Sequence, residues 1–522
     1  MPPRVTNSNP MRIFFRELEI EAHEGETLLS ALGRAGVPVS APCGGKHRCG
    51  KCLVRIIKGR VKNILLNEKN SPGKDLPKDI VLACGSVPET DIVLEPVSEN
   101  AYEGGVYEQI SAENKNYEKK ELRAGIALDI GTTTVSARLV DLDTGAELDT
   151  YSALNKQRVY GADVMSRIGA AREGKTRELF TIINNQTREI LAGFMEKFGL
   201  ESIENLTVAA NTTMLHLFVN ENPSGMGEIP FKPVFLEERK YNGVDLDLPA
   251  GSIYIFPSIS AFVGADIVSG LTAINIMDSS ETVFFIDIGT NGEMALLHNG
   301  KLHCTSAAAG PALEGAEISC GVGSILGAIN KVEWTDGKLN YETIGGNEPI
   351  GICGCGLIDA MALMLDRGII DETGAFTDDD CEAFSIAPGV SITNRDVRQY
   401  QLAKSAILSA IRIVFENAGV KLDEAKKIYV AGGLGFYIDR NSAVRSGLLP
   451  DEFLDRIEVC GNTSLKGAVK ALMQPAVLSG GSAGEKSLDM ICREIVKTSH
   501  VLDLASDPAF MDAFAENMIF PA

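Results

Sequence analysis

Three apolar stretches of this 522-residue chain end in glycine turns, and two of these turns also carry acidic and hydroxyl residues. In the first, residues 126–135, an apolar run meets Asp129 and Gly131. We interpret it as a buried strand, a tight turn and a second strand. Gly131 has no Cβ to keep the backbone N–H groups of the turn away from a phosphate. Asp129 suits Mg²⁺, which favours one or two carboxylates together with water and phosphate oxygens. The turn adds three hydroxyl donors, those of Thr132, Thr133 and Thr134.

The same pattern returns at residues 284–293, where an apolar run ends at Asp287. An internal repeat at this distance implies two similar lobes that face each other. Two facing turns can grip the phosphate chain of one nucleotide between them. The candidate phosphate-binding residues of this second turn are Gly289, Thr290, Asn291 and Gly292.

The third stretch, residues 428–435, is a strand that runs into a glycine turn. Its small residues suit close contact with an adenine and a ribose. The candidate residues for this contact are Gly432, Gly433 and Leu434.

In their order and spacing, these three stretches resemble the phosphate-1, phosphate-2 and adenosine motifs of the actin, Hsp70 and sugar-kinase ATPase superfamily. One such turn alone is a weak signal, and the repeat strengthens it. The resemblance implies bound ATP and Mg²⁺ in a two-lobed α/β fold made of duplicated RNase H-like halves. It also implies a connecting helix before the second turn, which residues 262–271 fit. Asp266 then stands where the superfamily places the residue that orients the attacking water.

A second group of residues with metal chemistry lies near the N-terminus. Its four cysteines have the spacing C-x5-C-x2-C with a distant fourth member: Cys43, Cys49, Cys52 and Cys84. The glycines of this loop let backbone N–H groups point at the sulfurs, which offsets their concentrated negative charge. One alternative is a structural zinc site, although such sites usually show two short C-x2-C pairs. The spacing resembles that of adrenodoxin-like ferredoxins, which carry a [2Fe–2S] cluster, and we interpret His47 as a neighbouring loop side chain.

The elements that must position these groups form two parts. The pattern predicts a hairpin at residues 11–21 and a short helix at residues 26–36, which is typical of an α+β ferredoxin of the β-grasp class. A polar, charged stretch follows and predicts a flexible tether, with a charged helix on the body as the alternative. The predicted division is a disordered N-terminus, a ferredoxin domain, a linker and an ATPase of two lobes: 1–10, 11–97, 98–123, and 124–522 with lobes at 124–280 and 281–522.

Within the ATPase part, apolar spacing predicts helices at residues 173–198 and 401–417. We interpret His216 as a structural residue, and residues 353–356 as a turn before a helix instead of a metal site. Glu314, in the glycine-rich turn at residues 309–316, is either a second acidic group near the phosphates or a helix cap. The apolar C-terminal tail is expected to dock on the body.

Composition narrows the class of protein. The formal net charge is −21 and the pI is about 4.9, which disfavours a nucleic-acid partner. No apolar run is long enough for a transmembrane helix, and the N-terminus has no signal-peptide core, so the sequence predicts a cytoplasmic protein with no membrane partner. The 11 cysteines are then expected to be thiols or metal ligands.

A ferredoxin joined to an ATPase suits the movement of an electron to an acceptor of lower potential, with the nucleotide shifting a conformational equilibrium. The chain resembles the ATP-dependent reductive activators of corrinoid proteins in anaerobic methyltransferase systems. Besides the cysteines, the matching segments are residues 160–164, 262–266, 310–315, 351–354 and 517–521. The resemblance implies reduction of Co(II) to Co(I) in a corrinoid protein partner, an upstream electron donor and a homodimer. Larger members carry a middle domain, for which we expect no room, because the first phosphate motif begins soon after residue 124.

Two alternatives stay open at this point. One is an ATP-coupled electron donor to another metalloenzyme, like the activators of 2-hydroxyacyl-CoA dehydratases, which share one [4Fe–4S] cluster across a dimer and lack an N-terminal ferredoxin. The other is a redox binding or scaffold protein in which the nucleotide only sets the shape.

Overall fold

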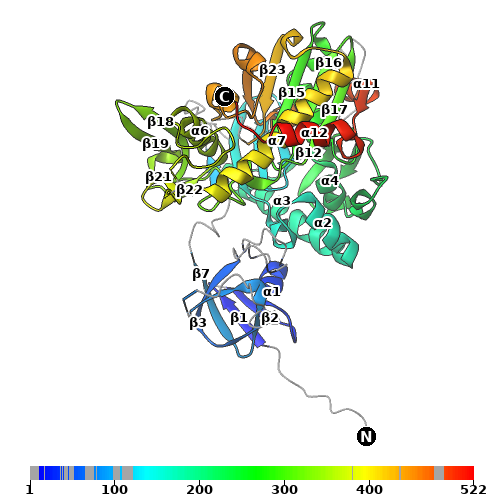
Figure 1. Ribbon diagram of the computed structural model, residues 1–522. Helices are drawn as coiled ribbons and strands as arrows, with labels where there is room; N and C mark the ends of the chain where they lie inside the picture. Colours follow the sequence, from blue (N-terminus) through cyan, green and yellow to red (C-terminus); the bar gives the residue numbers. More distant parts are fainter. Residues whose placement is uncertain are drawn as a thin grey trace.

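The computed structural model describes residues 11–521 except 17, 36, 38, 40–44, 46, 48–51, 65–75, 78, 98–105, 109–121, 379, 434–436 and 475–486. Our predictions for residues 1–10, Cys43, Cys49 and Leu434 concern positions outside these ranges, as do most of those for the linker. The described residues form a small N-terminal domain and a larger two-lobed body (Figure 1). None of their helices is both long and apolar enough to cross a membrane.

The N-terminal domain is a sheet in the order β2-β1-β7-β3-β5 with one helix packed on it. Strand β1 pairs antiparallel with β2 and parallel with β7, as in a β-grasp fold. The helix begins after Thr27, whose side chain accepts a hydrogen bond from the backbone N–H of Ser30. The elements are β1 Met11–Phe15, β2 Leu18–Ala22, α1 Leu28–Arg34, β3 Leu53–Lys58, β4 Val61–Asn63, β5 Ile80–Leu82, η1 Ala83–Gly85, β6 Ser86–Pro88 and β7 Ile92–Pro96.

The first lobe is built on a seven-stranded sheet in the order β13-β14-β12-β9-β10-β11-β8. Strands β9 and β10 form an antiparallel pair, and β12 lies parallel to β9. Its strands are β8 Val106–Glu108, β9 Ala124–Ile130, β10 Thr134–Asp141, β11 Glu147–Leu154, β12 Ile203–Ala210, β13 Arg239–Asn242 and β14 Ala250–Ile255. Its helices include η3 Lys156–Tyr160, α2 Val164–Ala170, α3 Thr176–Phe198, α4 Thr212–Phe218, η5 Pro223–Gly227, η6 Gly243–Leu246 and α5 Ala265–Ala273.

Strand β8 was not predicted, because it lies inside the stretch that the sequence assigned to a tether. Its three residues pair antiparallel with β11 and extend the sheet at its edge. Part of the connection between the two domains is therefore a strand of the body.

The second lobe repeats the arrangement of the first. In its sheet, β24-β23-β15-β16-β17-β25, strands β15 and β16 are antiparallel and β23 lies parallel to β15. This matches β9, β10 and β12, so the predicted duplication is confirmed. The strands are β15 Val283–Ile288, β16 Gly292–His298, β17 Lys301–Ala307, β23 Lys427–Ala431, β24 Ile457–Gly461 and β25 Ser499–Val501. The helices include η8 Pro311–Glu314, α6 Gly354–Asp366, α7 Asn394–Ala418, α8 Arg440–Arg445, α9 Thr463–Leu472, α11 Leu488–Thr498 and α12 Pro508–Glu516.

Smaller sheets lie beside α6 in the second lobe (Figure 1). One has the order β19-β18-β20 and the other pairs β21 with β22. Their strands are β18 Ala328–Thr335, β19 Lys338–Thr343, β20 Gly351–Ile352, β21 Ala383–Ala387 and β22 Val390–Thr393.

Helices α5 and α9 pack against each other between the two main sheets. The Thr207 hydroxyl on β12 donates to the carbonyl of Ala468 on α9 at 2.7 Å. Gly270 on α5 faces β15, where a Cβ would lie 3.0 Å from the Phe285 ring. A helix from late in the chain thus completes the core of the first lobe, so the two lobes share packed elements.

The C-terminal tail docks on α7, as expected. The Lys404 ammonium donates to the carbonyls of Asn517 and Ile519, both at 2.7 Å, and the ring of Phe520 stacks on Tyr400. Lys404 is fully buried, and burial lowers its pKa to about 8. The tail carbonyls therefore solvate a buried charge, which ties the chain end to the long helix of the second lobe.

The N-terminal domain lies below α2 and α3 of the first lobe (Figure 1). Helix α1 meets η3 there, and a Cβ on Gly33 would come within 3.2 Å of a Val159 methyl. The absence of a side chain at Gly33 therefore allows this close approach.

Candidate functional site

The two predicted phosphate turns occupy equivalent places in the two lobes, and each is closed by a backbone hydrogen bond from its first glycine. In the first, the Gly131 N–H donates to the Thr134 carbonyl at 2.9 Å, and in the second the Gly289 N–H donates to the Asn291 carbonyl at 2.9 Å. A Cβ on Gly131 would lie 2.8 Å from the Thr134 oxygen, so the turn requires glycine there. Each turn joins the antiparallel central pair of its lobe, which places both turns at the ends of buried strands.

The hydroxyls of the two turns converge on one carboxylate. Thr133 of the first lobe and Thr290 of the second donate to the same Glu314 oxygen, at 2.5 and 2.6 Å. Glu314 is the last residue of η8, a 3-10 helix of four residues within the predicted glycine-rich turn. No side chain caps η8; the Glu314 carboxylate instead accepts one hydroxyl hydrogen bond from each lobe.

Asp129 is held in place from the second half of the chain. The Asn462 side chain donates to one of its oxygens at 2.7 Å, and the Ser464 hydroxyl donates to the other at 2.8 Å. Both residues belong to the N-terminus of α9, where Asn462 is the cap. The sequence analysis missed them; the only available signal was the Asn-Thr-Ser run that starts a helix, and this run does not reveal its partner.

The predicted Asp266 and Asp287 lie with Asp129 in a cluster of repelling carboxylates. Burial and the charge of Asp129 raise the pKa of Asp266 to about 7. Burial raises the pKa of Asp287 well above its usual value, and Asp266, Asp129 and Glu314 add to the effect. Glu293, which the sequence analysis did not select, behaves in the same way beside Asp266 and Asp287. Burial and mutual repulsion therefore both favour the protonated forms of these carboxyl groups.

Such a cluster fits a hard divalent cation. Its donors are carboxylate oxygens, which Mg²⁺ prefers. Over the described part of the chain, no three His, Cys, Asp or Glu side chains converge as a direct metal cage.

The third predicted stretch packs directly on the second phosphate turn. Gly432 follows β23 with a positive φ of 99°, and a Cβ there would lie 2.6 Å from an Asp287 carboxylate oxygen. Gly433 faces open space, since nothing lies within 4 Å of its Cβ position. Gly432 therefore reaches the carboxylate cluster, whereas Gly433 borders open space.

The remaining predicted residues of the two phosphate turns have different surroundings. The Thr132 hydroxyl accepts a hydrogen bond from Asn211 at 3.0 Å, and Asn291 hydrogen-bonds Glu293. Thr134 begins β10 with an exposed side chain. Gly292 faces α7, where a Cβ would lie 3.1 Å from Ile407. Gly292 thus serves helix packing in this structure.

The carbonyls of the first turn are bound from behind by residues that the sequence analysis did not select. The Asn155 side chain donates to the Gly131 oxygen at 2.8 Å, and its backbone N–H donates to the Thr133 oxygen at 2.8 Å. Arg167 donates to the Thr132 oxygen at 2.5 Å. Arg167 is fully buried, and burial lowers its pKa to about 9. All three successive carbonyls of the turn are therefore occupied.

In the N-terminal domain, the structure describes two of the four predicted cluster cysteines, Cys52 and Cys84, and both are buried. The Cys84 N–H points at the Cys52 sulfur at 3.4 Å, and the His47 ring lies 3.3 Å from the Cys84 sulfur. N–H groups aimed at cysteine sulfurs are what an iron–sulfur cluster needs. The two described residues fit such a group, and His47 lies beside them, as predicted.

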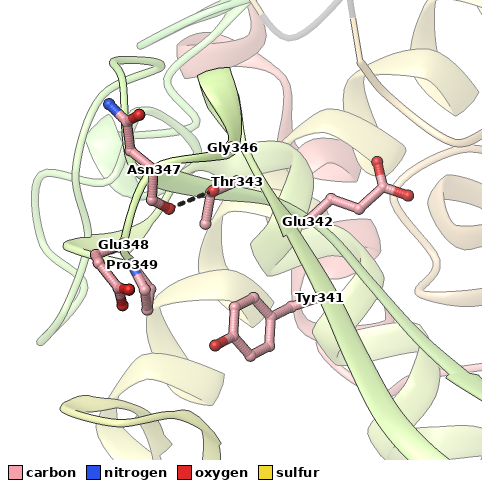
Figure 2. Close-up of a pocket in the computed structure, with 7 residues that line it drawn as sticks. All are labelled: Tyr341, Glu342, Thr343, Gly346, Asn347, Glu348 and Pro349. Atoms are coloured by element: carbon pink, nitrogen blue, oxygen red, sulfur yellow. Dashed lines mark hydrogen bonds between the residues drawn. The ribbon is translucent and has the colours of Figure 1, made fainter.

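A surface hollow of about 460 Å³ lies on β19 and the turn that follows it (Figure 2). Tyr341 and Glu342 line it from the strand, and residues 346–349 line it from the turn. It shares no residue with the phosphate turns or the carboxylate cluster, so we assign it no part in the site.

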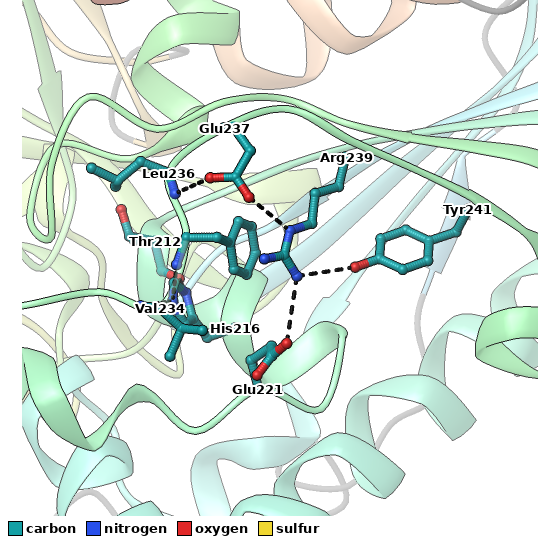
Figure 3. A network of polar contacts seen from close by, with 9 residues as sticks. Thr212, His216, Glu221, Val234, Leu236, Glu237, Arg239 and Tyr241 are labelled. Carbon is teal, nitrogen blue, oxygen red and sulfur yellow. Dashed lines mark hydrogen bonds and ion pairs between the residues drawn. The ribbon is translucent and has the colours of Figure 1, made fainter.

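His216 is a structural residue, as the sequence analysis held. Its Nδ1 lies 2.7 Å from the Thr212 carbonyl, and its Nε2 accepts the Val234 N–H at 2.9 Å (Figure 3). Burial lowers the pKa of His216, and Arg239 lies over the neighbouring Phe235 ring. The network anchors the loop before β13 to α4.

Comparison with known proteins covers almost the whole chain. Residues 281–522 match a model described as the C-terminal domain of RACo, the ASKHA domain; residues 124–279 match the RACo middle region; and residues 14–89 match a 2Fe-2S iron-sulfur cluster binding domain. The matched middle region begins at residue 124 and includes the first phosphate turn, so it corresponds to the first lobe. Our expectation that no separate domain lies between the linker and this turn stays a prediction.

Individual relatives agree with these matches. The chain is 31% identical over 601 residues to the corrinoid activation enzyme RamQ of Eubacterium limosum, covering 98% of this chain and 99% of the relative. It is 28% identical over 390 residues to the [Co(II) methylated amine-specific corrinoid protein] reductase of Methanosarcina barkeri, covering 68% and 71%. A solved reductive activator for corrinoid, iron-sulfur protein superposes with a TM-score of 0.70 at 27% identity, covering 98% of both chains.

Proposed function

We propose, from the premise that this chain belongs to the RACo family of corrinoid-protein activators, that it uses ATP to drive an electron from its N-terminal domain to a corrinoid protein. The acceptor is the inactive Co(II) form, and the product is the reactive Co(I) form. One electron is transferred for each cobalt. When bound, a [2Fe–2S] cluster supplies electrons one at a time, which matches this stoichiometry.

One observation carries the proposal. The Thr133 and Thr290 hydroxyls, from different lobes, meet at a single point beside a carboxylate cluster, in the same chain as a buried cysteine pair. A nucleotide bound at that point contacts both lobes, so its binding changes the position of one lobe relative to the other. Electron transfer alone needs no such device.

We assign the residues as follows. Cys43, Cys49, Cys52 and Cys84 hold the cluster. Asp129 and Asp287 hold Mg²⁺, directly or through water, and the ion screens the phosphates when it is present. Gly432, Gly433 and Leu434 contact the adenosine. The remaining nucleotide contacts are Gly131, Thr132, Thr133, Gly289, Thr290 and Asn291.

Asp266 orients the attacking water and accepts its proton. A base with a pKa of about 7 is half-ionised at neutral pH, where general-base catalysis is most effective. Gly264 leaves room for this carboxylate, because a Cβ there would lie 2.7 Å from an Asp266 oxygen. The carboxylate is therefore free to approach the bound phosphate.

We further propose an external low-potential electron donor, a homodimer and a cytoplasmic location, as the resemblance implies. The donor must reduce the N-terminal domain again after each transfer, because we assign no other redox group to the chain.

The test is anaerobic reduction of a methylamine-type corrinoid protein held as Co(II). The protein is reconstituted with iron and sulfide, reduced with titanium(III) citrate and supplied with Mg-ATP, and Co(I) is followed by its absorption. Asp129→Asn and Asp287→Asn should each reduce ATP-dependent Co(I) formation at least tenfold and keep the visible absorption of the cluster. Asp512→Asn, an exposed aspartate on α12, is the matched control. Wild-type rates that are equal with and without ATP would sink the proposal.

A further inference from the structure

The first phosphate turn is held from behind by a single segment. Asn155 binds the Gly131 and Thr133 carbonyls, as described above, and it also begins η3 by accepting the Gln157 N–H at 2.9 Å. The other end of this segment, Gly161, is bound by Arg167, whose Nε donates to the Gly161 carbonyl at 3.1 Å. Because Arg167 also binds Thr132, both ends of residues 155–161 are bonded to the turn.

The outer side of this segment meets the N-terminal domain. Val159 is only 9% exposed, and the residue closest to it on α1 is Gly33, where a Cβ would lie 3.2 Å from one Val159 methyl and 3.3 Å from its Cβ. Burial and then the charge of Glu178 raise the pKa of the neighbouring Tyr160, and Glu26 of the N-terminal domain adds a smaller effect in the same direction. The segment thus touches the turn on one side and the iron–sulfur domain on the other.

Nucleotide binding must disturb the turn at this point. A phosphate at the turn replaces Glu314 as the acceptor of the Thr133 hydroxyl, because the two compete for the same donor. A peptide group is planar, so a rotation that redirects an N–H toward a phosphate also moves the carbonyl on its other side. The carbonyls of Gly131, Thr132 and Thr133 are all bonded to residues 155–161 or to Arg167, so the segment follows the movement.

We propose that residues 155–161 link nucleotide occupancy to the position of the N-terminal domain, with Val159 as the positioning residue at the contact. The inference rests on the proposed function, because it explains how a nucleotide at the cleft alters electron delivery from a separate domain. The contact is small and apolar, formed by a glycine and a valine. A small contact is easily made and broken, as a transfer cycle requires.

The test uses the full-length, cluster-loaded protein and one pair of matched variants. Val159→Glu places a carboxylate at the contact with Gly33. Val244→Glu makes the same change at a valine of the same lobe that is 91% exposed. Neither residue touches the turn, so nucleotide affinity should stay within about twofold in both. ATP-dependent Co(I) formation should fall at least tenfold in the first variant only.

A second measurement reports the linkage without the corrinoid reaction. Hydrogen–deuterium exchange of residues 28–34 is compared with and without a non-hydrolysable ATP analogue. In wild type and Val244→Glu the analogue should change the exchange of this helix. In Val159→Glu the change should disappear. A nucleotide-dependent change that survives in Val159→Glu, or one that is absent from wild type, overturns the linkage.

A double substitution separates loss of contact from loss of folding. Gly33→Ala crowds Val159, and Val159→Ala frees the space, so the double variant should regain most of the coupling lost by Gly33→Ala. Additive losses would contradict the contact. If wild type reduces no corrinoid protein but shows the exchange change that Val159→Glu abolishes, the proposed function fails and the linkage stands.

Discussion

In the proposed nucleotide site, Glu314 is the residue expected to oppose a bound phosphate most directly. Its carboxylate takes the Thr133 and Thr290 hydroxyls that a phosphate would use, and its charge adds to that of Asp287. Glu314→Gln keeps the shape and removes the charge. We expect ATP without Mg²⁺ to bind roughly tenfold tighter, about 1.4 kcal/mol, because one repulsive charge near the phosphates is gone.

Fluorescence titration with a labelled nucleotide measures this affinity. Glu317→Gln, an exposed glutamate just beyond η8, is the control and should bind as wild type does. Weaker binding in Glu314→Gln would mean that the carboxylate assists the nucleotide.

Asp266 makes nucleotide binding sensitive to pH. Its folded-state pKa of about 7 lies above the unfolded value, so the folded protein keeps a proton that the unfolded chain releases between about pH 4 and 7. The contribution of this group to stability therefore falls as pH rises through that window. A cation that binds the ionised form displaces the proton, so Mg-ATP binding at pH 7 should release about half a proton from Asp266.

Calorimetry in two buffers of different ionisation enthalpy measures this release. We expect the difference between the two buffers to shrink at pH 8.5 and in Asp266→Asn. Equal heats in both buffers at pH 7 would contradict the raised pKa.

At the residue scale, the sequence was enough to predict those site side chains that lie next to a strand within a single motif. Asp129 and Thr133 are examples, because strand, turn and hydroxyl are adjacent in the chain. Asn462 and Asn155 were not predicted. Each binds a partner that the fold brings in from a distant position, and no local pattern reveals that partner.

At the scale of elements, the crossing of α5 and α9 sets how closely the lobes approach. A Cβ on Gly467 would overlap the backbone oxygen of Ser269, which rigid helix packing cannot relieve. Gly467→Ala should therefore destabilise the protein by about 1–3 kcal/mol or more. Thermal unfolding monitored by circular dichroism measures the effect.

The matched control is Gly169→Ala on α2, where nothing lies within 4 Å of the Cβ position. There, alanine should stabilise the helix by about 0.5–1 kcal/mol. Equal shifts in melting temperature for both variants would show that the crossing is not tightly packed.

Apolar runs and glycine turns were enough to predict the central strands of both lobes and the long helices. Strand β8 and helix α9 were not predicted. Strand β8 has three residues in a polar stretch, and its structure comes from pairing with β11. Helix α9 was overlooked because its apolar face is short and its position depends on a sheet from the other lobe.

For the whole molecule, the docked chain end is a test of long-range packing. Lys404→Met removes the ammonium that binds the Asn517 and Ile519 carbonyls and leaves these buried groups without their donor. We expect a loss of about 2–4 kcal/mol in the free energy of unfolding, measured by denaturant titration of the full-length protein. Lys466→Met, an exposed lysine on α9, should change it by less than about 0.5 kcal/mol.

The order of domains was predictable because the duplicated turns and the cysteine spacing are each visible in the chain. The contact between Gly33 and Val159 was not, since a glycine at an interface has the same sequence signature as any helix glycine. Interfaces between domains depend on shape, and shape appears only after folding.

Strand β8 fixes how far the electron carrier can travel. Only residues 97–105 connect β7 to β8, and nine residues in full extension span roughly 30 Å. While β8 stays paired, this length limits the distance between the N-terminal domain and the β8 edge of the first-lobe sheet. A redox acceptor must therefore approach the N-terminal domain on that side of the first lobe.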